Sequence, residues 1–401
     1  MSANTTSLQL PPLSLYIHIP WCVQKCPYCD FNSHQAEQKK HALDEQRYIT
    51  TLKNDLVLES QFAFGRKLTS IFFGGGTPSI FSAQGIAEIL QHAEKIIGFN
   101  DDIEITLEAN PGTFEQEKFS GFYAAGVNRL SIGVQSFNTH HLRTLGRIHN
   151  SDEATNAVKI AKKAGFTNIN IDIMHGLPEQ SLAQAMDDVQ QAIACAPQHI
   201  SWYQLTIEPN TAFYRQPPEL PHDDILADIQ DQGIALLAEN GFEQYEISAF
   251  SQPRRQSRHN INYWQFGDYL GVGAGAHGKI TDCENDTIIR RQKTRLPDHY
   301  MQHAESPKTQ QSDIAIDERP LEFMMNALRL TQGVPAAYFA TRTGLSLELI
   351  LLKIEQLQHQ ELLEKHPSQL KTTALGQRFL NTVLEKLNEE IVNTDALHLH
   401  P

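Results

Sequence analysis

Three cysteines within eight residues form the part of this chain best suited to chemistry. Cys22, Cys26 and Cys29 have the spacing Cys-x3-Cys-x2-Cys, and the only other cysteines in the 401-residue sequence are Cys195 and Cys283. Thiolates are preferred ligands of soft metals and of iron–sulfur clusters. A [4Fe–4S] cluster held by three cysteines leaves one iron open to a ligand that is not protein. We therefore expect a cluster with one open coordination position.

A zinc site is the alternative for the same cysteines. Structural zinc takes four ligands, and the fourth would come from His18, Asp30 or His34. The missing fourth cysteine, the flanking aromatic residues and the strand–helix pattern that follows favour a cluster.

Strands alternate with helices over the first two-thirds of the chain, and these elements must position the cysteine site. Strands are predicted at Leu13–Ile19, Leu68–Phe73, Ile103–Glu108, Arg129–Val134, Asn168–Ile173 and His199–Ile207. Amphipathic helical spacing between them predicts βαβ units and a parallel sheet. Each strand runs into a distinctive loop, and functional sites of parallel α/β folds lie at the carboxyl ends of strands.

Most of these strands alternate apolar and polar residues. Ile105 stands between Glu104 and Thr106, for example. Successive side chains point to opposite faces, so one face packs on helices and the other is polar. In the last strand the same rule assigns Tyr203 to the apolar face and Trp202 to the polar one. The pattern predicts an α/β fold, a partial barrel with a ligand inside.

The remainder of the chain has a different pattern. A strand is predicted at Phe242–Ala249, a loop over the barrel mouth at the glycine-rich Gly273–Gly278, and an irregular polar connection at 281–318. The C-terminal elements predicted are helices at Leu321–Leu330, Pro335–Thr341 and Leu347–Gln358, a hairpin at Leu362–Lys371 and a last helix from Leu375 to Glu389. Three helices followed by a hairpin resemble a winged helix.

Composition limits the partners. The formal charge is −14, which disfavours nucleic acid, and residues 301–401 carry 9 basic against 13 acidic residues. No apolar run is long enough to span a membrane, and Met1–Pro12 has no secretory signal pattern. Few cysteines in a large chain indicate a reducing compartment, so a cytoplasmic protein is expected, with peripheral membrane association left open.

The cysteine motif, with Tyr28 before its last cysteine, resembles the radical S-adenosylmethionine (SAM) superfamily. That resemblance implies that SAM chelates the open iron by its amino and carboxylate groups. Reduction of the cluster then cleaves SAM to a 5′-deoxyadenosyl radical.

Five segments narrow the resemblance to the oxygen-independent coproporphyrinogen III oxidase group. They are Tyr16–Phe31, Gly74–Pro78, Glu108–Pro111, Gly133–Phe137 and Asp172–Pro178. The resemblance implies that nine residues contact SAM: Tyr16, Tyr28, Gly75, Gly76, Thr77, Glu108, Gln135, Arg147 and Asp172. The glycines would let backbone N–H groups donate to a carboxylate, and Arg147 would pair with a carboxylate.

Two features point away from the oxidases. Phe31 stands where they have a fourth cysteine, and only 15 residues precede Tyr16. His259, Tyr263 and Trp264 instead form a segment similar to the HNxxYW motif of the HemW heme chaperones.

For this motif the resemblance implies heme, with an imidazole as iron ligand and aromatic faces for the porphyrin. His259, Tyr263 and Trp264 are the candidates, and Arg254, Arg255 and Arg258 are candidates for the propionates. From the residues alone, a loop packed by Trp264 is the alternative.

We therefore expect a heme chaperone with a [4Fe–4S] cluster, SAM and heme as its cofactors and cargo. Heme-accepting apoproteins, respiratory enzymes among them, would be its partners, with the chain a monomer or a homodimer. The alternative is an oxygen-independent coproporphyrinogen III dehydrogenase; a radical enzyme acting on RNA or a metabolite is more distant.

Four segments follow from these patterns. They are an N-terminal tail (1–12), a radical SAM partial barrel (13–240), a barrel-extending segment with the HNxxYW-like motif and the glycine-rich loop (241–318), and a mostly helical, winged-helix-like domain (319–401).

Overall fold

A curved sheet organises the computed structural model, which describes residues 6–36, 43–112 and 116–389. In these residues the sheet has twelve strands in the order β14-β13-β12-β11-β1-β4-β5-β6-β7-β8-β10-β9. Its six central strands run parallel and follow the chain order. They are β1 (Leu13–Ile19), β4 (Leu68–Gly75), β5 (Phe99–Ala109), β6 (Arg129–Gln135), β7 (Ile169–His175) and β8 (His199–Gln204). The predicted α/β partial barrel is confirmed.

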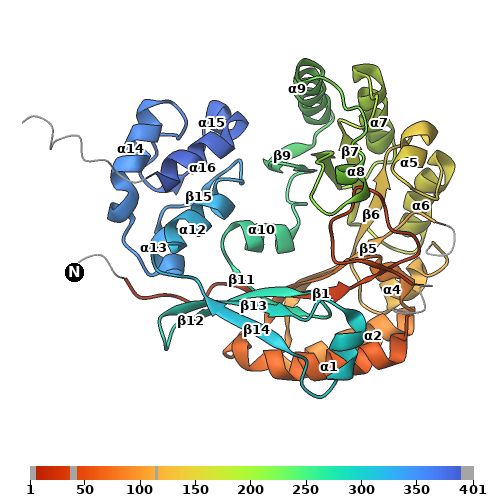
Figure 1. Cartoon of the computed structure of the whole chain (residues 1–401), viewed down its shortest axis with the longest axis horizontal. Coiled ribbons are helices and arrows are strands. Elements are labelled where there is room, and N and C mark those ends of the chain that lie inside the picture. Colours follow the sequence, from red (N-terminus) through yellow and green to blue (C-terminus); the bar gives the residue numbers. More distant parts are fainter. Residues whose placement is uncertain (1–5, 37–42, 113–115, 390–401) are drawn as a thin grey trace, which may run out of the picture.

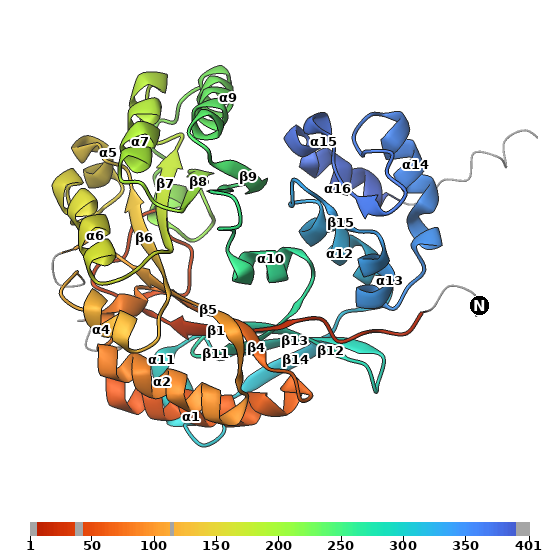
Figure 2. The same cartoon turned by 180° about the vertical axis from the view of Figure 1, so that it is seen from behind.

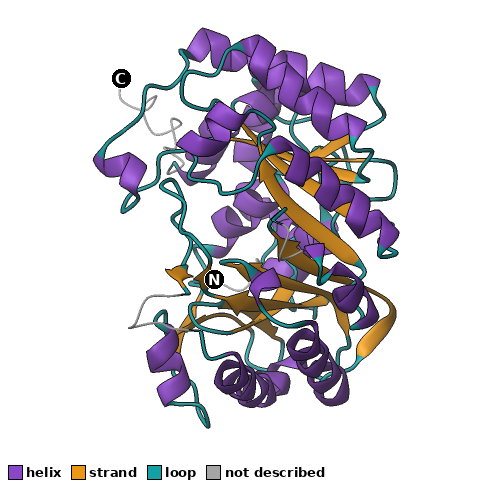
Figure 3. Cartoon of the chain, turned by 90° about the vertical axis from the view of Figure 1, so that its right-hand side faces the viewer, coloured by secondary structure: helices purple, strands orange, loops and turns teal. Residues whose placement is uncertain are grey.

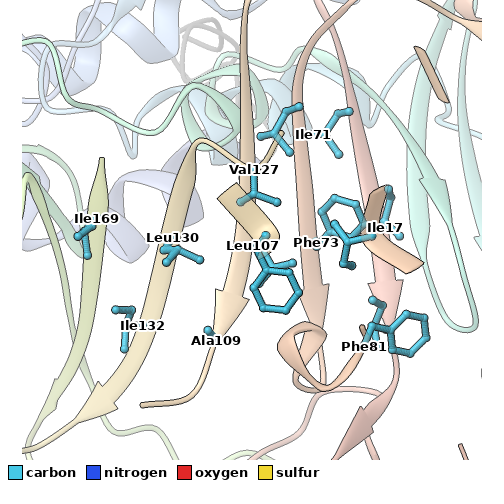
Figure 4. Close-up of a cluster of buried hydrophobic side chains, with 14 of the residues drawn as sticks. Ile17, Ile71, Phe73, Phe81, Leu107, Ala109, Val127, Leu130, Ile132 and Ile169 are labelled. Atoms are coloured by element: carbon cyan, nitrogen blue, oxygen red, sulfur yellow. The ribbon is translucent and has the colours of Figure 1, made fainter. Parts of the chain in front are cut away.

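Helices cover the outer face of these strands (Figures 1 and 3). They include α1 (Glu45–Ser60), α2 (Ala83–Ile96), α4 (Phe119–Ala124), α6 (Ser151–Lys163), α7 (Leu182–Ala194) and α9 (Asp223–Glu239). Short elements lie between them: η1 (Gln61–Ala63), η2 (Pro78–Ile80), α5 (Thr139–Thr144) and α8 (Ala212–Arg215). The strands' outward apolar side chains, such as Ile17, Phe73 and Leu107, are fully buried against these helices (Figure 4).

The opposite face of the central strands is polar, as the alternation predicts. Glu104, Thr106 and Ser131 on that face are buried, and they take part in hydrogen bonds within the barrel. Strand β8 is the exception, because its two faces are exchanged relative to the prediction.

In β8, Trp202 lies in the core under the helices and Tyr203 lines the interior. The reason is Gly233 of α9, where an added Cβ would lie 1.9 Å from the Trp202 ring. The helix therefore makes room for an indole on the outer face. The strand also ends at Gln204 rather than at Ile207.

Past α9 the chain widens the sheet at both edges. β9 (Glu243–Glu246) and β10 (Ala249–Ser251) form a hairpin where one strand was predicted, and β10 pairs antiparallel with β8. The chain then crosses to the other edge through α10 (Arg258–Trp264), and β11 (Asp268–Val272) pairs parallel with β1.

The predicted irregular connection at 281–318 is wrong. This region completes β12 (His277–Asp282) and forms β13 (Thr287–Lys293), α11 (Pro297–Gln302) and β14 (Thr309–Asp313). Its polar sequence concealed the strands because basic side chains of β13 are buried in ion pairs. Lys293 Nζ lies 2.5 Å from both Asp55 and Glu59 of α1. Buried charges persist only when paired in this way.

The C-terminal part is mostly helical, as predicted. It contains α12 (Arg319–Ala327), β15 (Val334–Pro335), α13 (Ala337–Thr343), η3 (Leu347–Ile350), α14 (Leu351–His359), β16 (Gln369–Leu370), α15 (Ala374–Arg378) and α16 (Leu380–Asn388). The predicted hairpin closes through one bridge between Leu363 and Thr372, and β16 returns to pair with β15. The predicted last helix is broken in two at Phe379.

Figures 1 and 2 show α10 in the middle of the molecule, between the C-terminal helices and the barrel strands. A separate apolar cluster that includes Phe323, Phe339 and Val383 forms the core of the C-terminal part. The four predicted segment boundaries stay a prediction, and residues 1–5 of the tail and 390–401 of the last segment lie outside the described residues. Within the described residues, no helix is long and apolar enough to cross a membrane.

Candidate functional site: two adjoining cavities

The cysteine loop starts directly from the end of β1. Cys22 ends the short strand β2 (Trp21–Cys22), which pairs with β3 (His34–Gln35), and Cys26 and Cys29 lie on the loop between these strands. The sulfur of Cys29 lies 3.8 Å from Ser33 Oγ. All three thiols line one cavity of about 280 Å³.

Glycines of the β4 loop allow the cysteine loop to lie this close. Gly76 N–H donates to Ile19 O (2.8 Å) and Thr77 N–H donates to Trp21 O (2.7 Å). A Cβ on Gly76 would lie 2.5 Å from Trp21 O, and Gly75 has a φ of +113°. The expectation that the Gly74–Gly76 segment donates its N–H groups to a ligand is therefore wrong for Gly76, whose N–H is used to hold the loop.

Burial and the neighbouring cysteines raise the pKa of two of these thiols, Cys22 and Cys29. Burial, with a smaller contribution from Cys29 and Cys26, raises the pKa of Cys22 to about 11. Burial also raises the pKa of Cys29. Thiols of this kind are poor free nucleophiles and become thiolates when a metal binds. The donor set fits an iron–sulfur cluster held by three cysteines.

Two of the three proposed fourth zinc ligands, His18 and Asp30, have other positions. His18 uses both ring nitrogens, with Nδ1 2.9 Å from Tyr16 OH and Nε2 2.9 Å from Asn32 O. Asp30 lines a second cavity rather than the one with the thiols. These contacts disfavour a zinc site completed by either residue.

The first cavity gathers eight of the nine residues that the resemblance assigns to SAM. They are Tyr28, Gly75, Gly76, Thr77, Glu108, Gln135, Arg147 and Asp172. Tyr16 lies outside it, in the wall of the second cavity. Gly75, Glu108 and Gln135 lie at or next to the carboxyl ends of β4, β5 and β6, while Asp172 comes from the middle of β7. A ligand bound beside the three cysteines would contact these residues.

Two carboxyl groups face the first cavity. Burial and the nearby Asp172 raise the pKa of Glu108 to about 8, although Gly75 N–H donates to it. Asp172 accepts hydrogen bonds from Asn170 Nδ2 (2.8 Å) and Ser131 Oγ (3.0 Å). Such acceptors suit an ammonium group or ribose hydroxyls.

The first cavity also contains a positively charged side chain, Arg147, and a residue with a strained backbone, Gln135. Arg147 donates through Nη1 to Asn110 Oδ1 (3.0 Å), while its Nε is buried without a partner in the described residues. The Arg147 guanidinium can therefore bind a carboxylate group of a ligand. Gln135 has a φ of +70° and accepts from Tyr203 OH (2.7 Å). Strain of this kind clusters at ligand sites.

A second cavity, of about 630 Å³, adjoins the first. Phe31, whose surface is 65% exposed, belongs to the lining of both. The second cavity is lined by Tyr16, His18, Asp30, Phe31, Asn32, His259, Tyr263, Tyr269, Gly275, His277, Gln292 and Arg295. Its volume lies within the roughly 300–1,000 Å³ of small-molecule sites.

Helix α10 presents His259 and Tyr263 to this second cavity. Its first turn is anchored by Glu104 of β5, which accepts from the backbone N–H of Arg258 (2.9 Å) and of His259 (3.3 Å). Asn262 donates to Ser14 Oγ of β1 (2.9 Å). Burial lowers the pKa of His259 to about 3, so its imidazole is neutral and able to ligate a metal.

The other heme candidates lie elsewhere. Trp264 faces the C-terminal part, with the Arg329 guanidinium 4.2 Å from its ring centre. Arg258 pairs with Asp102 at 2.6 Å, and neither Arg254 nor Arg255 lines the cavity. The structure brings His259 and Tyr263 together and leaves Trp264 and the three arginines outside.

Several lining residues have no signal in the sequence. Tyr203 was assigned to the wrong strand face, and Tyr269, Gln292 and Arg295 lie in segments that carry no site motif. His277, by contrast, belongs to the glycine-rich segment Gly273–Gly278 and is the first residue of β12, where the loop from β11 ends. That loop packs on the cysteine loop, because Asn32 Nδ2 donates to Ala274 O (2.9 Å).

Comparisons with known proteins agree with this architecture. The radical SAM superfamily model matches residues 16–191 and the HemN C-terminal domain model matches residues 315–379. The structure of coproporphyrinogen III oxidase (HemN) from Escherichia coli has a TM-score of 0.78 at 22% identity, covering 94% of this chain and 90% of that one. At that identity the likeness shows the fold alone.

Relatives found by sequence comparison are more similar to this chain than that structure is. Heme chaperone HemW from Haemophilus influenzae is 50% identical over 381 residues, covering 94% of this chain and 98% of that protein. Heme chaperone HemW from Escherichia coli is 48% identical over 380 residues, with the same two shares. A mitochondrial radical S-adenosyl methionine domain-containing protein 1 from Danio rerio is 34% identical, covering 80% and 73%.

The pKa of Glu108 generates a stability prediction. Because this pKa rises from its usual 4.5 to about 8 on folding, protonation of Glu108 stabilises the fold at pH below 4.5. That contribution is lost as the pH rises toward 8. Glu108→Gln, which stays neutral, should therefore gain about 1–3 kcal/mol over the wild type between pH 5 and pH 8.

Urea unfolding of the ligand-free protein at both pH values measures this gain. Glu219→Gln, which changes an exposed carboxylate, should show no such gain. An equal effect of Glu108→Gln at pH 5 and pH 8 would contradict the assignment.

Proposed function

The chain belongs to the HemW family of the radical SAM superfamily, and from this membership we propose that it is a heme chaperone. It binds a [4Fe–4S] cluster, SAM and heme, and it passes heme to acceptor proteins. The identity of those acceptors and the cytoplasmic setting stay predictions.

One observation carries the proposal. The helix that bears the HNxxYW-like motif supplies His259 and Tyr263 to a cavity of about 630 Å³, and this cavity shares Phe31 with the cavity of the three cysteines. A neutral imidazole and aromatic side chains in one large cavity suit a porphyrin and its iron. The cofactor site and the cargo site are therefore neighbours.

Cys22, Cys26 and Cys29 would hold the cluster in the first cavity. The Arg147 guanidinium would bind a SAM carboxylate, and Glu108 and Asp172 would accept hydrogen bonds from its ammonium or ribose groups. When bound and reduced, a cluster with SAM supplies one-electron chemistry. The residues around it orient the ligand and exclude water from it.

Heme would lie in the second cavity with His259 as an iron ligand. Desolvation keeps this imidazole neutral, and Ser70 Oγ lies 3.4 Å from its Nδ1, which orients the ring. Phe72 packs against the ring with a centroid distance of 5.1 Å. These contacts hold the imidazole in place before heme arrives.

The alternative function is an oxygen-independent coproporphyrinogen III dehydrogenase. The likeness to HemN supports only a shared fold, and Phe31 occupies the position where the oxidases are expected to have a further cysteine. We therefore favour heme transport over porphyrinogen decarboxylation.

The cluster assignment predicts a clear difference between cysteines. After anaerobic reconstitution, Cys22→Ser, Cys26→Ser and Cys29→Ser should each lose the cluster, measured as iron and sulfide content. Cys195→Ser and Cys283→Ser should keep the wild-type content, because these residues lie outside both cavities. Cluster retention in any of the first three variants would contradict the assignment.

Heme binding tests the cargo directly. The reconstituted full chain should bind about one heme, and His259→Ala should change the Soret spectrum because it removes an axial ligand. His140→Ala, whose side chain is 65% exposed, is the control. An unchanged spectrum in His259→Ala would show that a residue other than His259 ligates the heme iron.

The same preparation separates the two functions. It should bind heme but fail to convert coproporphyrinogen III to protoporphyrinogen IX with SAM and a reductant. Robust conversion would overturn the chaperone proposal, and so would a failure to bind heme.

A further inference from the structure

The second cavity has walls of two different kinds. Tyr16 of β1 and His259 and Tyr263 of α10 form an aromatic wall, with 6.4 Å between the ring centres of Tyr16 and His259. His277, Gln292 and Arg295 come from β12, from β13 and from the loop after β13, and they form a polar rim. A flat ligand with one polar edge would match this division.

Arg295 is the available cation of that rim. The other basic residues in this stretch are engaged: Arg290 pairs with Glu322, Arg291 with Glu59, and Lys293 with Asp55 and Glu59. The Arg295 guanidinium has no hydrogen bond or ion pair with any residue in the described part of the chain. Its charge is therefore free for a ligand.

The position of Arg295 is nevertheless fixed at its backbone. Asn32 Nδ2 donates to Arg295 O (2.8 Å) and to Ala274 O (2.9 Å), which ties the residue to the cysteine loop. The guanidinium therefore extends from an anchored point at the cavity edge. Its planar donors match a carboxylate.

Two neutral donors lie next to this cation. His277 and Gln292 are paired across the β12–β13 ladder. Burial and the charges of Arg290 and Arg295 lower the pKa of His277, so its ring is neutral. Neither side chain has a hydrogen-bond partner among the residues that the structure describes. The rim thus offers one charge and further N–H donors.

We propose that Arg295, with Gln292 and His277, binds the carboxylate groups of the porphyrin cargo. The macrocycle then lies against Tyr16 and Tyr263, with its propionates toward the β12–β13 rim. This inference rests on the proposed heme-chaperone function and assigns its propionate site. It replaces Arg254, Arg255 and Arg258 in that role, since none of them lines the cavity.

Asp30 gives the same cavity an opposing charge. Its carboxylate lies in the lining and would repel a propionate. Arg295 should therefore strengthen the binding of a carboxylate ligand, and Asp30 should weaken it. Neither effect is expected for a ligand whose carboxylates are esterified.

The experiment compares ferric heme with heme dimethyl ester on the full, reconstituted chain by Soret titration. The wild type should bind heme about three- to tenfold more tightly than the ester. Arg295→Gln should remove that preference while leaving the affinity for the ester unchanged. Asp30→Asn should increase the preference, and Arg254→Gln, which alters an exposed arginine outside the cavity, should keep the wild-type ratio.

The outcomes are distinct. Stoichiometric binding of both ligands with an equal ratio in the wild type and Arg295→Gln would overturn this inference and leave the chaperone function standing. An equal loss in Arg254→Gln would also overturn it. If neither ligand binds, the proposed function fails and the inference fails with it.

Discussion

The side-chain amide of Asn32 makes the contact on which both cavities depend. It donates to the carbonyl oxygens of Ala274 and Arg295, and so it joins the cysteine loop to the strands added beside β1. His18 Nε2 meets Asn32 O at 2.9 Å and fixes the same residue from the barrel side. This junction ties the loop that carries the thiols to the rim that faces the second cavity, and Tyr48 OH reinforces it by donating to His18 O and accepting from Ala274 N–H, both at 2.8 Å.

Buried charged residues stabilise the structure around the cavities where they are paired and destabilise it where they are not. Lys293, Asp55 and Glu59 are almost fully buried, and their pairing holds α1 to β13 behind the glycine-rich loop. Tyr300 OH donates to Asp55 at 2.6 Å and accepts from Gly273 N–H at 3.1 Å. In the first cavity, by contrast, burial raises the pKa of Glu108 and of Asp172, and the charge of Arg129 opposes this shift without an ion pair to either group within the described residues. That arrangement destabilises the ligand-free site and favours a ligand that brings positive charge.

Much of the fold follows from local sequence patterns. The apolar run before the cysteines predicted β1 with the same boundaries as the structure, and the alternation in the later strands predicted the polar interior of the barrel. It failed where tertiary contacts outweigh pattern. Gly233 allows Trp202 to pack outward, and the paired Lys293 allows a polar segment to form a strand near one edge of the widened sheet. Neither effect is readable before the partner segment is known.

Some residues of the candidate site could likewise be predicted from the sequence, and others could not. Cys22, Cys26 and Cys29 were recognisable from spacing, and His259 from a motif, because in both cases the chemistry lies within a few residues. Arg295 carries no such signal, since a single arginine in a polar segment resembles a solvated surface residue. Only the pairing of β12 with β13 and the hydrogen bond from Asn32 place it at the cavity.

The proposed function requires that the cluster and the heme occupy neighbouring cavities of one chain. Iron-edge anomalous diffraction from crystals of the protein loaded with both groups tests this most directly. We expect iron density beside Cys22, Cys26 and Cys29 and a second iron in the cavity lined by Tyr16, His259 and Arg295. Heme iron located away from that cavity, for example between Trp264 and the C-terminal helices, would contradict it.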